Sequence, residues 1–183
     1  MSTNYSGVES AVWRWLDEAV IKLNLCPFAH QPRQQNKIKL VCTQAVEPDD
    51  ILQHLFSELM FLQQTPATDT TLLVLTEALE DFYNYNQFLD ECDRLLVNEG
   101  LVGEFQIASF HPDYQFAGTE KQDRENFTNR SPYPILHLIR EQQLEDEIAR
   151  YPNVELIPER NIQKLSSLNE QQMRAIFGKQ FKR

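Results

Sequence analysis

The sequence contains only five glycines in 183 residues, and none of them stands in a phosphate-binding pattern. Neither GxGxxG nor GxxxxGK occurs in the chain. Both motifs need glycine because their backbone must approach a phosphate group closely. We therefore expect no nucleotide binding in either of these two standard modes.

Cysteines and long apolar runs are scarce as well. Three cysteines without metal-type spacing are typical of reduced thiols inside a cell. The N-terminal residues lack the basic and apolar regions of a signal peptide. No stretch approaches the roughly twenty apolar residues that a membrane span needs. We expect a cytoplasmic protein of bacterial type that enters no membrane.

Positive charge is the third shortage, because the formal net charge is −10. An acidic chain repels polyanions, so nucleic acid is not an expected partner. Hydrophobic residues make up 42% and charged residues 24% of the chain, which are ordinary values for a folded protein. The length predicts one globular domain over residues 1–183, with short loose ends at 1–5 and about 178–183.

Hydrophobic periodicity predicts helices that alternate with strands. Five helices are expected at residues 6–23, from Pro48, from Asp81 to Gly100, from the Ser131-Pro-Tyr-Pro run to about Tyr151, and from Asn161 onward. Four strands are expected at residues 37–43, 70–76, 104–110 and 154–157. This order predicts an α/β layered domain with about four mostly parallel strands alternating with five helices. Strand order stays open, and an antiparallel edge strand is compatible with the pattern.

The stretch from residue 109 to residue 137 is where we expect the function. After the third strand the chain breaks at His111-Pro112 and runs for some twenty residues without clear periodicity. A loop of that length inside a compact domain is usually functional. Aromatic side chains occur every few residues along it, and they either line a ligand pocket or pack the loop onto its own domain.

Three residues of this region are candidate catalytic groups. His111 follows a strand directly and could act as a general acid or base, with Asp113 orienting its ring. His137, in the first turn of the expected fourth helix, would be a second polar contact. The alternative is structural: His111 bonds to backbone, Asp113 makes an Asx-turn, and His137 is a satisfied core histidine.

Four further residues are candidate ligand-binding groups. Arg130 and Arg140 could clamp a small anionic molecule, and Ser131 lies where a helix N-terminus would offer N–H groups. Tyr114 is one of the aromatics that could line the pocket. In the structural alternative Ser131 only caps the helix and the arginines pair with solvent or protein carboxylates. Arg160 is a lesser anion-binding candidate.

Cys26 is the most interesting thiol, because it lies between a helix end and a proline. It could be a nucleophile or a metal or haem ligand if His111 or His137 approaches it, and otherwise it packs as a small apolar residue. His111, Asp113, His137 and Cys26 would together suit zinc. However, neither HExxH nor CxxC occurs, so the sequence predicts no metal site and names no cofactor.

Several runs of residues resemble a known family. They are WRWLDEAVIKLNLCPFA, ASFHPDYQFAGT, NRSPYPILHLIRE and IPERNI, and they span residues 12–162. The family is bacterial and is known only as a domain of unknown function, so the resemblance implies no activity, cofactor or site residue.

The residues therefore favour an enzyme or small-ligand-binding protein with an anion-accepting His/Asp/Arg pocket in the region 109–140. Two alternatives stay open: a protein-interaction module that uses the same loop, and a metal- or haem-binding protein through Cys26 and a histidine. No signal indicates the reaction, the substrate or the oligomeric state.

Overall fold

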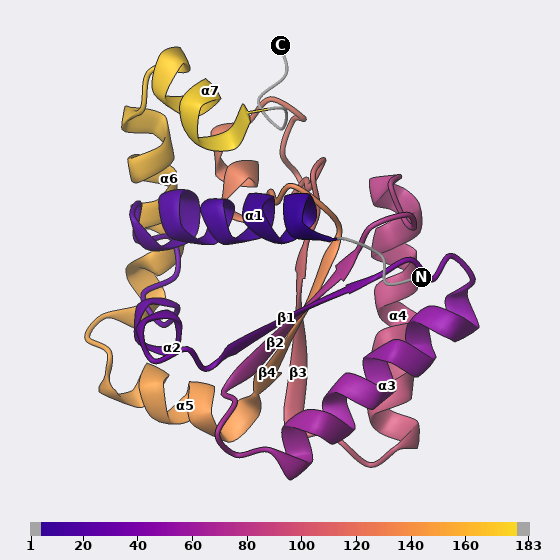
Figure 1. Cartoon of the computed structure of the whole chain (residues 1–183). Helices are drawn as coiled ribbons and strands as arrows, with labels where there is room; N and C mark the ends of the chain where they lie inside the picture. The colour runs from indigo at the N-terminus through magenta and orange to yellow at the C-terminus, as the bar shows by residue number, and fades with distance from the viewer. Residues whose placement is uncertain (1–4, 179–183) are drawn as a thin grey trace.

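The computed structural model describes residues 5–178, and a four-stranded mixed sheet lies at its centre (Figure 1). The strands are β1 (Ile38–Thr43), β2 (Thr70–Leu75), β3 (Phe105–Phe110) and β4 (Ile135–Arg140), in the order β1-β2-β4-β3. β1 pairs with β2 in parallel, whereas β4 runs antiparallel to both of its neighbours, β2 and β3. Strand β4 is therefore an inner strand that opposes the other three.

The prediction of a mostly parallel sheet is wrong, because two of the three strand pairings are antiparallel. The error comes from residues 135–140, which form β4 and not the start of a helix. Both faces of β4 are covered, so its apolar residues do not alternate with polar ones and the strand period is hidden. The strand expected at 154–157 is absent: these residues form a short 3₁₀ turn and the start of a helix.

The helical segments outnumber the five that were expected. They are α1 (Ser6–Trp15), η1 (Leu16–Ile21), α2 (His30–Gln34), α3 (Pro48–Gln64), α4 (Phe82–Asn98), η2 (Arg124–Thr128), α5 (Glu141–Arg150), η3 (Val154–Leu156), α6 (Ile157–Ser167) and α7 (Glu170–Phe177). One added α-helix is short α2, in the polar turn after Pro27. The other arises because the C-terminal helix breaks before Asn169, whose side chain starts α7 with a capping box.

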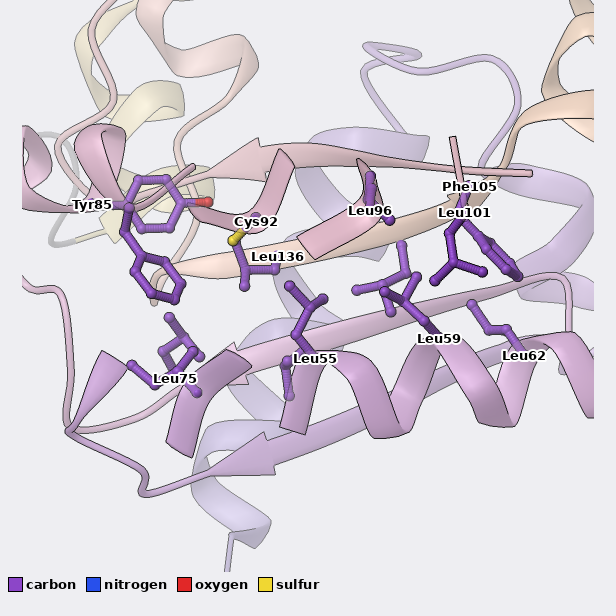
Figure 2. Close-up of a cluster of buried hydrophobic side chains, with 14 of the residues drawn as sticks. Leu55, Leu59, Leu62, Leu75, Tyr85, Cys92, Leu96, Leu101, Phe105 and Leu136 are labelled. Atoms are coloured by element: carbon purple, nitrogen blue, oxygen red, sulfur yellow. The ribbon is translucent and has the colours of Figure 1, made fainter. Parts of the chain in front are cut away.

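Helices α3 and α4 cover one face of the sheet and form the first core (Figure 2). Pro48 begins α3, Asp81 caps α4 by accepting a hydrogen bond from Asn84 N at 3.0 Å, and Gly100 follows α4 with φ +67°. These three helix ends are as predicted. Fully buried side chains of this core include Leu55, Leu59, Tyr85, Leu73 and Leu136.

The helices α1, α6 and α7 lie on the other face, together with α2 and α5 (Figure 1). Residues of α1, η1, α6 and α7 form the second core with the strands, and Val12, Ala19, Leu165 and Met173 are fully buried in it. In contrast, α5 contributes no buried residue. The end of the sheet next to α2 and α5 is therefore covered less tightly than the rest.

No helix between residues 5 and 178 is both long and apolar enough to cross a membrane. The loose ends expected at 1–5 and about 178–183 lie, apart from Tyr5 and Gly178, outside the described residues.

Candidate functional site

A pocket of about 350 Å³ lies on the second face of the sheet. Its floor is the sheet, one wall is the α1–η1 helix, a second wall is the segment 26–32, and its roof is α5. Most of the lining is apolar, with contributions from Trp15, Val20, Phe28 and Leu72. A concave, mainly apolar pocket with a few polar groups is the usual form of a small-molecule site.

The sheet register puts His137 in the middle of the pocket floor. His137 of β4 is the Cα partner of Leu72 on β2 and of Ala108 on β3. Side chains of directly opposed residues point to the same face, so these three form a row across the sheet. Ala108 is small, and its methyl group leaves the space above the row open.

Helix α5 forms the roof with one side of its surface. Glu147 and Ile148 lie three and four residues after Leu144, and all three line the pocket. This spacing explains why a clearly amphipathic helix has no buried residue: its apolar side faces the pocket and not the packed core. Ile148 is accordingly 37% exposed.

His137 is held in one tautomer by its neighbour Thr70. The Thr70 hydroxyl donates its only proton to Leu138 O, and its oxygen lies 2.7 Å from Nε2 of His137. Nε2 must therefore carry a proton and donate to Thr70, which leaves Nδ1 with a lone pair. Burial lowers the pKa of His137 to about 4. The ring is neutral at physiological pH.

The Nδ1 atom of His137 is accessible from the pocket. Among residues 5–178 it has no hydrogen-bond partner in the protein. In the same part of the chain, Thr71 Oγ1 is the one buried side-chain nitrogen or oxygen that lacks a partner. Since Nδ1 is not such a buried atom and the residue lines the pocket, its lone pair faces the cavity.

Charged residues that line the pocket are Asp69, Arg140 and Glu147. Asp69 forms an ion pair with Lys37, with 3.5 Å between Oδ1 and Nζ. Burial, together with the charge of Asp69, raises the pKa of Glu147. The Arg140 guanidinium donates to the carbonyl oxygens of Leu62, Thr65 and Thr68, at 3.1 Å for the last two. Through Nε and Nη2 it therefore holds the end of α3 and the connection to β2.

Cys26 also lines this pocket, so the structure brings it to the same cavity as His137. Burial raises the pKa of the Cys26 thiol, against the opposing effect of hydrogen bonds from the backbone of Phe28 and Ala29. The sulfur is therefore a protonated thiol and a weak nucleophile at neutral pH.

The structure does not bring His111 to this pocket. His111 is fully buried, and its ring packs against Phe82 and Tyr85 of α4, with centroids 5.3 and 5.0 Å away. Its Nδ1 accepts from Asp113 N at 3.0 Å, so Nε2 donates to Leu79 O, also at 3.0 Å. Burial lowers the pKa of His111. This histidine connects the loop to the segment before α4.

The other residues predicted in the loop contact one another and not the pocket. Arg130 donates to Tyr114 O at 3.2 Å and to Lys121 O at 2.6 Å, and its guanidinium lies over the ring of Phe127. The Ser131 hydroxyl donates to Tyr133 O. The ring of Tyr114 packs against those of Phe82 and Phe116.

The Asp113 carboxylate forms an ion pair with Lys121, with 3.8 Å between Oδ1 and Nζ. Catalytic roles for His111, Asp113 and His137, and an anion-binding role for Arg130, Arg140, Tyr114 and Ser131, stay predictions. Between residues 5 and 178, no group of three or more His, Cys, Asp or Glu side chains could hold a metal ion.

Sequence reasoning missed Thr70, Asp69, Ala108 and Glu147. Thr70 stands at the start of an apolar strand, and Ala108 is an ordinary strand residue. Neither residue type carries a signal by itself, because both meet His137 only through the antiparallel pairing of β4. Glu147 stands among other acidic residues in the sequence, and its place three residues after Leu144 was the one available signal.

No curated protein and no solved structure matches the chain. The resemblance noted over residues 12–162 is confirmed and extends further in both directions. A family model described as a protein of unknown function, DUF1415, matches residues 7–175, and the chain belongs to this family.

Proposed function

We propose that this protein binds a small, mainly apolar and uncharged molecule in the pocket between the sheet and α5. The observation that carries the proposal is the pocket itself: an apolar cavity of about 350 Å³ with the neutral Nδ1 of His137 on its floor. A lone pair in an apolar cavity favours a ligand with one hydrogen-bond donor, because the donor would otherwise lose its bond to water on burial.

The charges around the pocket support an uncharged ligand more than the small anion expected from the sequence. Among the lining residues that belong to the described range 5–178, Arg140 is the one cation, and it donates to three carbonyl oxygens. Asp69 and Glu147 are carboxyl groups and would repel an anion. Arg130, the other predicted clamp residue, holds carbonyl oxygens of the loop 111–134.

The same groups support binding in preference to catalysis. A histidine whose pKa is about 4 is a poor proton acceptor at neutral pH, because it holds a proton too weakly. The Cys26 thiol is protonated, since burial raises its pKa. The pocket thus combines a mainly apolar surface with the acceptor Nδ1 of His137 on its floor.

The test compares two ligands that differ by one donor, butylphenol and butylanisole. Calorimetric titration should show binding of both, with butylphenol about tenfold tighter because its hydroxyl reaches Nδ1 of His137. His137→Phe should remove this preference. A wild-type protein that binds neither compound, or binds both equally well, would contradict the proposal.

A second variant tests the location. Ala108→Leu adds volume beside His137 on the pocket floor and should weaken binding of both compounds by about tenfold or more. Ala149→Leu makes the same change at an exposed position of α5 and serves as the control. Equal affinities for the two variants would place the binding site elsewhere.

A further inference from the structure

A second pocket, of about 300 Å³, lies outside the apolar one, beside α6 and the end of the first helix. Three of its lining residues are cations: Lys22, Arg160 and Lys164. The other lining residues are uncharged, and they are Leu23, Asn24, Pro27, Tyr151, Ile157 and Asn161. No acidic residue lines it within the part of the chain that the structure describes. In a protein of net charge −10, this concentration of cations is unusual.

Two elements hold the cations together. Arg160 and Lys164 are four residues apart on α6 and so lie on the same side of that helix. Lys22 follows η1 directly. Asn161 joins the two elements, because its side-chain amide donates to Leu25 O at 2.8 Å and it is only 5% exposed. The cations are thus carried by packed helices and not by a long loop.

Within residues 5–178, Arg160 and Lys164 have no acidic partner, in contrast to Lys22. Lys22 forms an ion pair with Glu18 at 2.7 Å. Between residues 5 and 178, neither the Arg160 nor the Lys164 side chain makes an ion pair or a hydrogen bond. Glu159, the acidic neighbour of Arg160, instead accepts a hydrogen bond from Gln163 at 3.0 Å. Like charges four residues apart destabilise a helix, and a bound anion would reverse that effect.

We propose that this cationic pocket binds a small, multiply charged anion, through the phosphate or carboxylate groups of a metabolite. Arg160 offers a planar guanidinium that pairs with two oxygen atoms at once, and the lysines add point charges on either side. The sequence led us to expect an anion site in the region 109–140, but Arg130 and Arg140 donate there to backbone carbonyl groups. The cationic pocket provides the cluster of cations instead.

The anion site is separate from the apolar pocket, although the two are neighbours. Pro27 lines the cationic pocket and Phe28 lines the apolar one. The rings of Phe28 and Tyr151 contact each other edge-on, with centroids 5.5 Å apart, at the wall between them. The proposal therefore does not depend on the apolar ligand, and each site can be tested without the other.

The experiment is a calorimetric titration with pyrophosphate and, separately, with citrate at about 20 mM ionic strength, where surface charges are little screened. We expect at least one of the two anions to bind. Tighter binding of pyrophosphate would indicate a phosphate-bearing ligand, and tighter binding of citrate a carboxylate-bearing one. Arg160→Gln combined with Lys164→Gln should weaken that binding about tenfold or more.

The control removes two charges elsewhere. Arg94→Gln combined with Lys121→Gln changes the net charge equally, at residues that line neither pocket. This control should keep the wild-type affinity for the anion, and both double variants should keep the wild-type affinity for butylphenol. The proposal fails if neither anion binds, if the first double variant binds as well as wild type, or if the control loses as much affinity.

Discussion

At the scale of single residues, the ionisation of His137 should make the free energy of unfolding depend on pH. Burial lowers its folded-state pKa to about 4 from the ordinary value of 6.5. Between these values the unfolded chain binds a proton that the folded chain does not, so stability is complete above pH 6.5 and falls as the pH falls toward 4. The loss should reach up to about 3 kcal/mol.

Urea unfolding from pH 7 to pH 4 measures this effect, with His137→Phe for comparison. His111 acts in the same direction because its pKa is also lowered, and Glu147 acts in the opposite direction because its pKa is raised. Both His111 and Glu147 remain in the His137→Phe variant. The difference between wild type and this variant in how the free energy of unfolding changes with pH is therefore due to His137. If the free energies of unfolding of wild type and His137→Phe change with pH in parallel, the His137 ring is protonated as easily in the folded state as in the unfolded state.

At the scale of elements, Arg140 joins β4 to the end of α3. Its guanidinium donates to Leu62 O, Thr65 O and Thr68 O. Arg140→Ala leaves these carbonyl groups without that partner and should lower the free energy of unfolding by about 2–3 kcal/mol. Arg140→Lys should recover only part of the loss, because an ammonium group cannot reach three acceptors in a fixed fork.

Denaturant titration with circular dichroism measures these values. The control is Arg150→Ala on the exposed side of α5, which should change stability by less than about 0.5 kcal/mol. Equal losses for Arg140→Ala and Arg150→Ala would mean that the hydrogen bonds to the carbonyl groups contribute little.

The same elements show how far the sequence could predict the fold. Strands β1, β2 and β3 and the ends of α3 and α4 were predictable, because local rules of alternation, proline placement and capping determine them. Strand β4 was not, because residues 135–140 are apolar toward both cores and follow a proline that also begins helices. Reading β4 as a helix then made the sheet look mostly parallel.

For the molecule as a whole, the candidate site was predictable only as single residues. His137 and Cys26 were recognised and lie at one pocket, but Thr70, Ala108 and α5 reach that pocket only through the strand order β1-β2-β4-β3. His111 was chosen because it follows a strand, and the structure shows it packed against α4. Long-range pairing, which one sequence does not display, decides which polar residues meet.

The absence of buried residues in α5 also has a consequence for motion. Glu141 N, at the start of α5, donates to the O atom of Glu104, the residue before β3, at 3.0 Å. Tyr151, the residue after the end of α5, packs its ring against that of Phe28. Little packed surface has to separate when α5 lifts, so this helix should open far more often than the whole protein unfolds. A ligand would then enter by local opening.

Amide hydrogen exchange followed by mass spectrometry measures this opening directly. The amides of α5 should exchange much faster than those of β2 and β4, and saturating butylphenol should slow α5 selectively. Equal amide exchange rates in α5 and in the inner strands would mean that α5 separates from the sheet only when the whole protein unfolds. Ligand entry and release would then be limited by the rate of global unfolding, and the occupancy of the pocket would change over hours and not milliseconds.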